Sequence, residues 1–216
     1  MKFICVIFAI QFLIYGYGHN HWFMLDNISP QPGETVQLTI NSGHHFPEGT
    51  FALPENFLVR QMVISPSGQS DFQTQVAEKQ RHASFEFKEP GIYLFQFDVK
   101  KPQMKKIKYS GRMWIATRGI VEAHSLKLGK GLEIVPQELL FSLKPGEDLA
   151  IQVLNNDQPV KAACTVFFPD GTQVLLQMNP GEATNFKLKS PGSYLLISHY
   201  NGAGSSLVFH LTEDLQ

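Results

Sequence analysis

With 216 residues, of which 43% are hydrophobic and 17% charged, the chain has an ordinary globular composition and is long enough for one large or two small domains. This composition, with 17 phenylalanines, excludes an intrinsically disordered protein. The formal net charge of −1 at pH 7 excludes the strongly basic surface expected of a nucleic-acid-binding protein.

Residues 1–18 have the pattern of a secretory signal peptide. Lys2 is followed by an almost uninterrupted apolar run, and Gly16 and Gly18 supply the small residues that precede a cleavage site. We therefore expect an exported, periplasmic protein whose mature chain begins at His19. The apolar run is shorter than the roughly 20 residues that span a bilayer, and no later run approaches that length, so we expect the mature protein to be soluble.

The rest of the chain has the pattern of an all-β protein. Helical periodicity is nearly absent, whereas short β-branched and aromatic runs bounded by Pro, Gly, Asn and Asp recur throughout. Residues 35–40, 84–87 and 93–97 alternate between apolar and polar side chains. Each of these runs is typical of a strand with one face on a core and the other in water.

A weak internal repeat relates the two halves of the chain. A Pro-Gly-Glu turn precedes an alternating run at 32–34 and again at 145–147. A Pro-Gly-x-Tyr sequence opens a late strand at 90–93 and again at 191–194. The repeat predicts two β-sandwiches of related plan.

The two expected domains meet in a polar stretch punctuated by glycines. We expect two consecutive β-sandwich domains of immunoglobulin-like or transthyretin-like type. They are an N-terminal β-sandwich at 19–118 and a C-terminal transthyretin-like β-sandwich at 131–216, joined by a linker at 119–130. The lysine-rich stretch from Lys100 to Lys108 has two interpretations, a docking patch for an anionic surface or a solvated hairpin tip whose lysines protect an edge strand.

Five of the eight histidines are placed where they could bind a metal. His19 and His21 lie at the expected mature N-terminus, His44 and His45 form a Gly-His-His turn just after an expected strand, and His199 ends a late strand. Imidazole is a common ligand of Zn, Cu, Ni and Co.

Cleavage after Gly18 would make His21 the third residue of the mature chain. The α-amine, two backbone amides and the His21 imidazole would then offer four nitrogens in one plane, which suits Cu(II) or Ni(II). The chain contains no Gly-x-Ser-x-Gly sequence and no phosphate-cradling glycine loop before a helix, so we do not expect an enzyme.

Several motifs together resemble one known family. They are His-Asn-His-Trp-Phe-Met from His19, Gly-His-His-Phe-Pro-Glu from Gly43, Tyr-Ser-Gly-Arg from Tyr109, Gly-Leu-Glu-Ile-Val-Pro from Gly131 and Gly-Ser-Tyr-Leu-Leu-Ile-Ser-His-Tyr from Gly192. In this order they resemble the DUF4198 family, exported proteins often described as NikM-like or as nickel uptake transporter family proteins. The resemblance covers essentially the whole mature chain.

The resemblance implies roles for particular residues. The family histidines correspond to His21, His44 and His199. The family often has Tyr-Ser-Lys where this chain has Tyr-Ser-Gly at 109–111, which leaves Arg112 as a stand-in for the lysine.

These observations predict an exported protein that binds a divalent transition metal and passes it to membrane transporter components. Nickel or cobalt is the expected ion, with copper and zinc as alternatives, and we expect His21, His44 and His199 to converge on one site. Two other functions fit the sequence. One is a non-metal binding or structural module of two sandwiches. The other is a copper enzyme in which the α-amine and imidazole of His19 clamp the metal with a second histidine.

Overall fold

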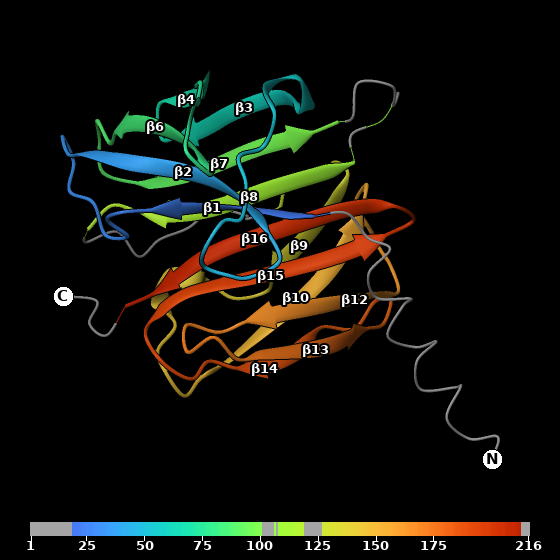
Figure 1. Ribbon diagram of the computed structural model, residues 1–216. Helices are drawn as coiled ribbons and strands as arrows, with labels where there is room; N and C mark the ends of the chain where they lie inside the picture. The colour runs from blue at the N-terminus through green and yellow to red at the C-terminus, as the bar shows by residue number, and fades with distance from the viewer. Residues whose placement is uncertain (1–18, 101–105, 107, 119–126, 213–216) are drawn as a thin grey trace, which may run out of the picture.

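The computed structural model describes residues 19–100, 106, 108–118 and 127–212 (Figure 1). The predicted signal peptide, most of the lysine-rich stretch and most of the 119–130 linker lie outside the described residues. Within them the regular structure is all β apart from two 3-10 helices of three residues each. The all-β prediction is confirmed.

The two halves of the described chain each contribute eight strands and one 3-10 helix. In the first half these are β1 (Asn20–Leu25), β2 (Thr35–Gly43), η1 (Glu55–Phe57), β3 (Leu58–Ser65), β4 (Gly68–Asp71), β5 (Gln75–Ala77), β6 (Gln80–Glu86), β7 (Ile92–Val99) and β8 (Tyr109–Ala116). In the second half they are β9 (Leu132–Pro136), η2 (Leu140–Ser142), β10 (Asp148–Asn155), β11 (Gln158–Pro159), β12 (Ala162–Phe167), β13 (Gln173–Met178), β14 (Thr184–Lys187), β15 (Gly192–Tyr200) and β16 (Ala203–Leu211). The three predicted alternating runs fall in β2, β6 and β7.

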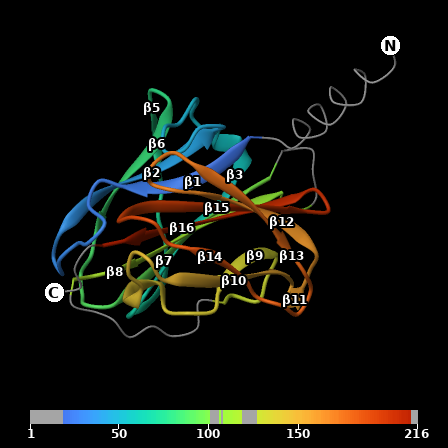
Figure 2. The same cartoon turned by 90° about the horizontal axis from the view of Figure 1, so that it is seen from below.

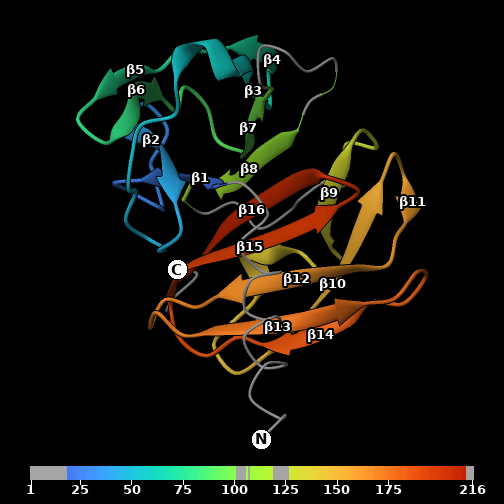
Figure 3. The same ribbon diagram turned by 45° about the vertical axis from the view of Figure 1, so that its right-hand side comes forward.

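The two halves share one continuous sheet. Its eight strands run in the order β13-β12-β15-β16-β8-β7-β3-β4, so that the second half supplies one side and the first half the other. They join where β16 pairs in parallel with β8, from Gly204 opposite Tyr109 to Val208 opposite Met113. Figure 3 shows this junction between the first half above and the second half below.

A smaller sheet covers each face of the shared sheet. The β1-β2-β6-β5 sheet lies on one face, and β10, flanked by β9, β11 and β14, lies on the other. In Figure 2, β15 and β16 run between β1 and β2 on one side and β10 on the other. The fold is therefore a pair of β-sandwiches that overlap in a common middle layer.

Each sandwich core contains side chains from the other half. Leu195, Ile197 and Val208 of the second half pack into the core beneath β1 and β2, and Leu94 and Trp114 of the first half pack into the core beneath β10. Full burial of one such side chain contributes about 1.5–3 kcal/mol. The two halves therefore stabilise each other.

The Pro-Gly-Glu repeat builds the same turn twice. The amide of Gly33 donates to the carbonyl of Phe87 (2.6 Å), and the amide of Gly146 donates to that of Leu188 (2.8 Å). Both glycines have positive φ, +87° and +92°, which a residue without a Cβ adopts at little cost. The prediction that the halves follow related plans is confirmed at this turn.

The Pro-Gly-x-Tyr repeat also builds one structure twice. The hydroxyl of Tyr93 donates to the carbonyl of Glu89 (2.9 Å), and that of Tyr194 donates to the carbonyl of Ser190 (2.8 Å). A tyrosine that bonds to the backbone a few residues upstream is a feature of immunoglobulin-like sandwiches. It fixes the chain where it enters β7 and β15.

Position 111 has room for glycine alone. A Cβ on Gly111 would lie 2.1 Å from the Cζ atom of Phe97, a side chain with no exposed surface. Arg112 points to the opposite face of β8, because neighbouring side chains alternate along a strand. Arg112 therefore does not occupy the space of a side chain at 111, and its role as a stand-in for the family lysine stays a prediction.

We expect Gly111→Ala to lower the free energy of unfolding by about 2 kcal/mol, because the added methyl overpacks a closed core. Urea unfolding would measure this. In the Phe97→Leu background the same substitution should cost less, since the ring it meets is gone. Equal costs in both backgrounds would contradict the steric explanation.

Candidate metal centre

The pairing of β1 with β2 brings the first histidines next to the Gly-His-His turn. The two strands are antiparallel, with Asn20 opposite Gly43 and His21 opposite Ser42. Residues just before β1 and just after β2 therefore meet at one end of the sheet. His19 precedes β1, and His44 follows β2.

The chain after β2 folds back on itself. The amides of Thr50 and Phe51 both donate to the carbonyl of Ser42, at 2.7 and 3.3 Å. The turn needs glycine at position 43, because a Cβ there would lie 2.4 Å from the Thr50 hydroxyl oxygen. The fold-back places both ends of the loop beside the start of β1.

His19 lies between the two ends of this loop. Its ring centroid is 4.9 Å from that of His44 and 4.5 Å from that of Phe51, which it meets edge to face. Both histidines are exposed, and so is the neighbouring His45. The structure thus places two solvent-accessible imidazoles side by side at the expected mature N-terminus.

His21 has a different environment from His19. Its side chain is buried, its Nδ1 is 2.8 Å from the hydroxyl of Ser42, and its ring meets that of Tyr109 edge to face at 5.0 Å. Burial, and secondarily the nearby charge of His19, lowers the pKa of His21 to about 3. His21 is therefore a neutral, packed side chain beneath the exposed pair.

His199 also has its ring near that of Tyr109. Its ring centroid is 6.3 Å from that of Tyr109, and its pKa is lowered by burial. Gly204, opposite His199 in β16, admits this contact, since a Cβ there would lie 2.4 Å from the Tyr109 ring. Burial also raises the pKa of Tyr109 to about 12, so its hydroxyl stays protonated.

The predicted site residues thus form two neighbouring groups. His19 and His44 form the exposed pair, while His21 and His199 both lie next to the Tyr109 ring. Among residues 19–100, 106, 108–118 and 127–212, no three His, Cys, Asp or Glu side chains are grouped so as to hold a metal ion. The convergence of His21, His44 and His199 stays a prediction.

The exposed pair needs one further ligand, and the backbone can supply it. If the mature chain starts at His19, its α-amine and its imidazole can chelate one ion, and the His44 imidazole can add a third nitrogen. Three ligands with open positions left for water or exchange suit a divalent transition metal.

The four-nitrogen chelate centred on His21 fits the fold poorly. Successive amides of a strand point to opposite edges, whereas this chelate needs the amides of Asn20 and His21 to face one centre. Asn20 and His21 are already paired with β2, and the His21 ring is bonded to Ser42. The first residues of β1 would have to separate from β2 to bind a metal in this way.

Sequence reasoning missed Tyr109, Ser42 and Phe51. Tyr109 was part of a recognised motif, but its proximity to both His21 and His199 depends on the β16–β8 pairing, which has no local sequence signal. Ser42 could have been found, because a residue beside the glycine of a turn faces its partner across the hairpin.

Another buried histidine predicts how stability depends on pH. His210 has its Nδ1 2.8 Å from the Ser193 hydroxyl, and burial lowers its pKa to about 4. Between that value and the unfolded pKa near 6.5, the unfolded chain binds a proton that the folded chain does not. The contribution of His210 to the free energy of unfolding should therefore be fully present above pH 6.5, and about 3 kcal/mol of it should be lost as the pH drops to about 4.

His210→Gln should reduce this loss, and His45→Gln, which removes an exposed histidine, should leave it unchanged. Urea unfolding near pH 7 and at about pH 4.5, in the presence of EDTA, would measure the difference. The buried His21 also makes the free energy of unfolding fall at low pH, in the parent and in both variants. An unchanged pH dependence in His210→Gln would show that this residue is not buried and neutral.

Comparisons with known proteins extend these observations. No protein of curated function matches the chain significantly in sequence. The described residues include no helix that is long and apolar enough to cross a membrane.

Solved structures resemble the fold only loosely. A tetra-tandem repeat from the extending region of a large adhesion protein has 12% identity and a TM-score of 0.31 over 91% of this chain and 50% of its own. A putative membrane-anchored protein from Corynebacterium diphtheriae has 12% identity and a TM-score of 0.33 over 91% of this chain and 60% of its own. A two-domain fibronectin type III segment of chicken tenascin has 13% identity and a TM-score of 0.27 over 88% of this chain and 97% of its own. The chain thus spans half the length of the adhesion-protein repeat, and none of these likenesses bears on function.

The family match is more extensive. The DUF4198 family, described as a domain of unknown function, matches residues 16–201. This range includes the histidine region at the start of β1 and every strand of the shared sheet except β16. The chain therefore belongs to the DUF4198 family.

Proposed function

We propose that this protein is exported, binds a divalent transition metal at its mature N-terminus and passes the ion to membrane transporter components. The observation that carries the proposal is the 4.9 Å separation between the exposed rings of His19 and His44. The proposed ligands are the α-amine and imidazole of His19 and the imidazole of His44.

The chemistry of these ligands suits a carrier. Nitrogen ligands of intermediate softness bind Co(II), Ni(II), Cu(II) and Zn(II), with copper the tightest of the divalent ions. Nickel or cobalt is the proposed cargo where the supply of copper is controlled. Because both imidazoles are exposed, an ion can enter and leave without opening the core.

The test changes the position of the α-amine relative to the His19 imidazole. Two proteins would be prepared, one beginning at His19 and one with a single glycine before it, and titrated calorimetrically with Ni(II), Co(II), Cu(II) and Zn(II). The extra residue moves the amine away from the His19 imidazole but leaves every side chain in place. We expect it to weaken binding on the order of 100-fold. Equal affinities would contradict the proposed ligand set, and absence of binding in both proteins would favour a structural or non-metal binding module.

The same ligands favour one enzymatic alternative. An N-terminal amine and imidazole together with a second imidazole could hold copper for oxidation of a substrate. Peroxide-dependent oxidation of a test substrate by the copper-loaded protein starting at His19 would support this function, whereas tight binding without turnover would favour the carrier.

A further inference from the structure

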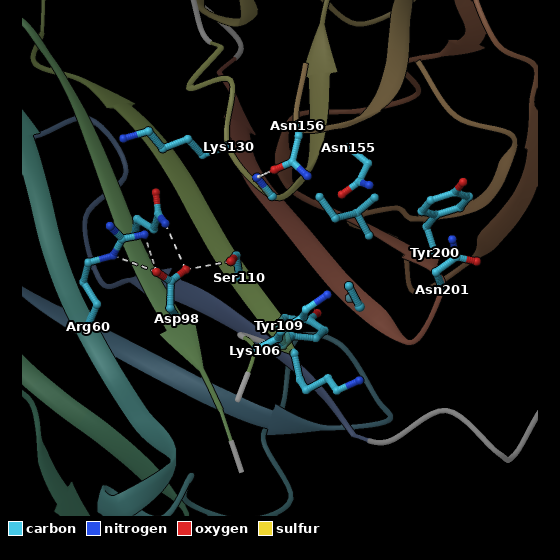
Figure 4. Close-up of a pocket in the computed structure, with 16 residues that line it drawn as sticks. Arg60, Asp98, Lys106, Tyr109, Ser110, Lys130, Asn155, Asn156, Tyr200 and Asn201 are labelled. Carbon is cyan, nitrogen blue, oxygen red and sulfur yellow. Dashed lines mark hydrogen bonds and ion pairs between the residues drawn. The ribbon is translucent and has the colours of Figure 1, made fainter. Parts of the chain in front are cut away.

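A cavity of about 390 Å³ opens where the two halves meet (Figure 4). Its walls come from β3, β7 and the start of β8 in the first half, and from the β9–β10 end and the β15–β16 turn in the second. A volume near the lower end of the usual range for ligand pockets suits a small molecule. Nothing in the proposed metal function uses this cavity.

The cavity and the histidine site occupy equivalent places in the two halves. The repeat that matches Gly33 with Gly146 also matches Gly43 with Asn156. In the first half, Asn20 lies opposite Gly43. In the second half, Gly131 lies beside Asn156, and the amide of Asn156 donates to the carbonyl of Gly131 (2.8 Å).

The two sites meet at Tyr109, which lies next to His21 and also lines the cavity. Tyr109 points its ring toward His21, whereas the next residue, Ser110, bonds to Asp98 in the cavity wall. The second half thus repeats the architecture of the histidine site with different side chains.

A buried carboxylate orients an arginine at the cavity. Asp98 has no exposed surface, and its Oδ2 accepts a hydrogen bond from the Nε of Arg60 (2.6 Å). Its Oδ1 accepts bonds from the Gln96 amide (2.9 Å) and the Ser110 hydroxyl (2.6 Å). Figure 4 shows these bonds converging on Asp98. These hydrogen bonds compensate the negative charge of Asp98 within the protein. Asp98 in turn holds the Arg60 guanidinium in one position at a partly exposed site.

Three lysines add charge that the protein does not neutralise. Lys106, Lys108 and Lys130 line the cavity, and in the described part of the chain none of them has a carboxylate within 4.0 Å. The ammonium of Lys108 extends over the β15–β16 turn, 3.5 Å from where a Cβ on Gly202 would lie. With Arg60 paired to Asp98, the cavity keeps a surplus of positive charge from both halves.

The remaining walls carry neutral hydrogen-bonding groups. Asn155, Asn201 and Tyr200 supply amides and a hydroxyl on the side away from Arg60 (Figure 4). Such groups fix the orientation of a ligand that the cations attract. We propose that this cavity binds a small polyanion, a molecule with two or more carboxylate or phosphate groups that Arg60, Lys108 and Lys130 contact from different sides.

The experiment titrates the metal-free protein calorimetrically with citrate and, separately, with inorganic pyrophosphate. The variant is Lys108→Gln combined with Lys130→Gln. The matched control is Lys88→Gln combined with Lys161→Gln, which removes the same charge from exposed lysines outside the cavity. We expect at least one anion to bind, and the cavity variant to weaken it about tenfold or more while the control changes little.

Comparing the two anions identifies which acidic group, carboxylate or phosphate, the cavity binds. Stronger binding of citrate would assign the cavity to carboxylates, and stronger binding of pyrophosphate would assign it to phosphates. Failure of both anions to bind would overturn the proposal, as would equal weakening by both double variants, because that would reveal only general charge attraction. These outcomes do not depend on whether the histidines bind a metal.

Discussion

Glu133→Ala should lower the free energy of unfolding by about 3–5 kcal/mol, the cost of breaking a buried ion pair. Glu133 and Arg112 are 1% and 4% exposed, and Arg112 donates from Nη1 to Glu133 Oε2 (3.3 Å). Burial lowers the pKa of Arg112, which shows the cost of holding its charge there. Removing the carboxylate leaves this charge unpaired in the protein interior.

Glu133 also accepts hydrogen bonds from the last residues of the linker between the halves. Its Oε2 accepts the amide of Leu128 (3.0 Å) and its Oε1 accepts that of Gly129 (2.7 Å). Alanine would leave both amides without this acceptor. Since Arg112 belongs to β8 and Glu133 to β9, the same substitution weakens the contact between the halves.

Three further variants make this prediction specific. Glu133→Gln keeps an acceptor and should cost less than Glu133→Ala, and Glu182→Ala, an exposed turn carboxylate, should cost little. Arg112→Met in the Glu133→Ala background should recover part of the loss, because it removes the unpaired charge. Denaturant unfolding would measure all of these. A loss below about 1 kcal/mol for Glu133→Ala would show that water reaches the pair.

Local patterns predicted the strands and turns but not how the halves join. Alternation and the Pro-Gly-Glu and Pro-Gly-x-Tyr repeats are short-range signals, and each was found at its expected place. The parallel pairing of β16 with β8 joins Gly204 to Tyr109 across almost a hundred residues of sequence. One trace of it in the sequence is Gly204, because a Cβ there would lie 2.4 Å from the Tyr109 ring.

The candidate site was predictable to a similar degree. His19 precedes β1 and His44 follows β2, so antiparallel pairing of these strands puts both at the same end of the sheet, and their proximity could be expected. The burial of His21 follows from the alternation of β1 only once the core beneath it is known. The place of His199 depends on the shared sheet, which the sequence alone does not reveal.

His44→Ala should weaken binding of Ni(II), Co(II) or Cu(II) to the chain beginning at His19 on the order of 100-fold, because it removes one of three proposed nitrogens. His45→Ala is the matched control, since it removes an adjacent exposed histidine and keeps the one whose ring lies 4.9 Å from His19. We expect this control to change the affinity only a few-fold. Calorimetric titration would compare the proteins.

The His199→Ala variant then distinguishes a site made by His19 and His44 from a site at which His21, His44 and His199 converge. Because His199 is not among the three proposed nitrogens, the pair predicts an affinity close to that of the parent, and the double variant with His44→Ala should bind no more weakly than His44→Ala alone. A large loss in His199→Ala would instead support the convergence of His21, His44 and His199. If His44→Ala bound as tightly as the parent, neither arrangement would hold, and the metal would have to bind elsewhere.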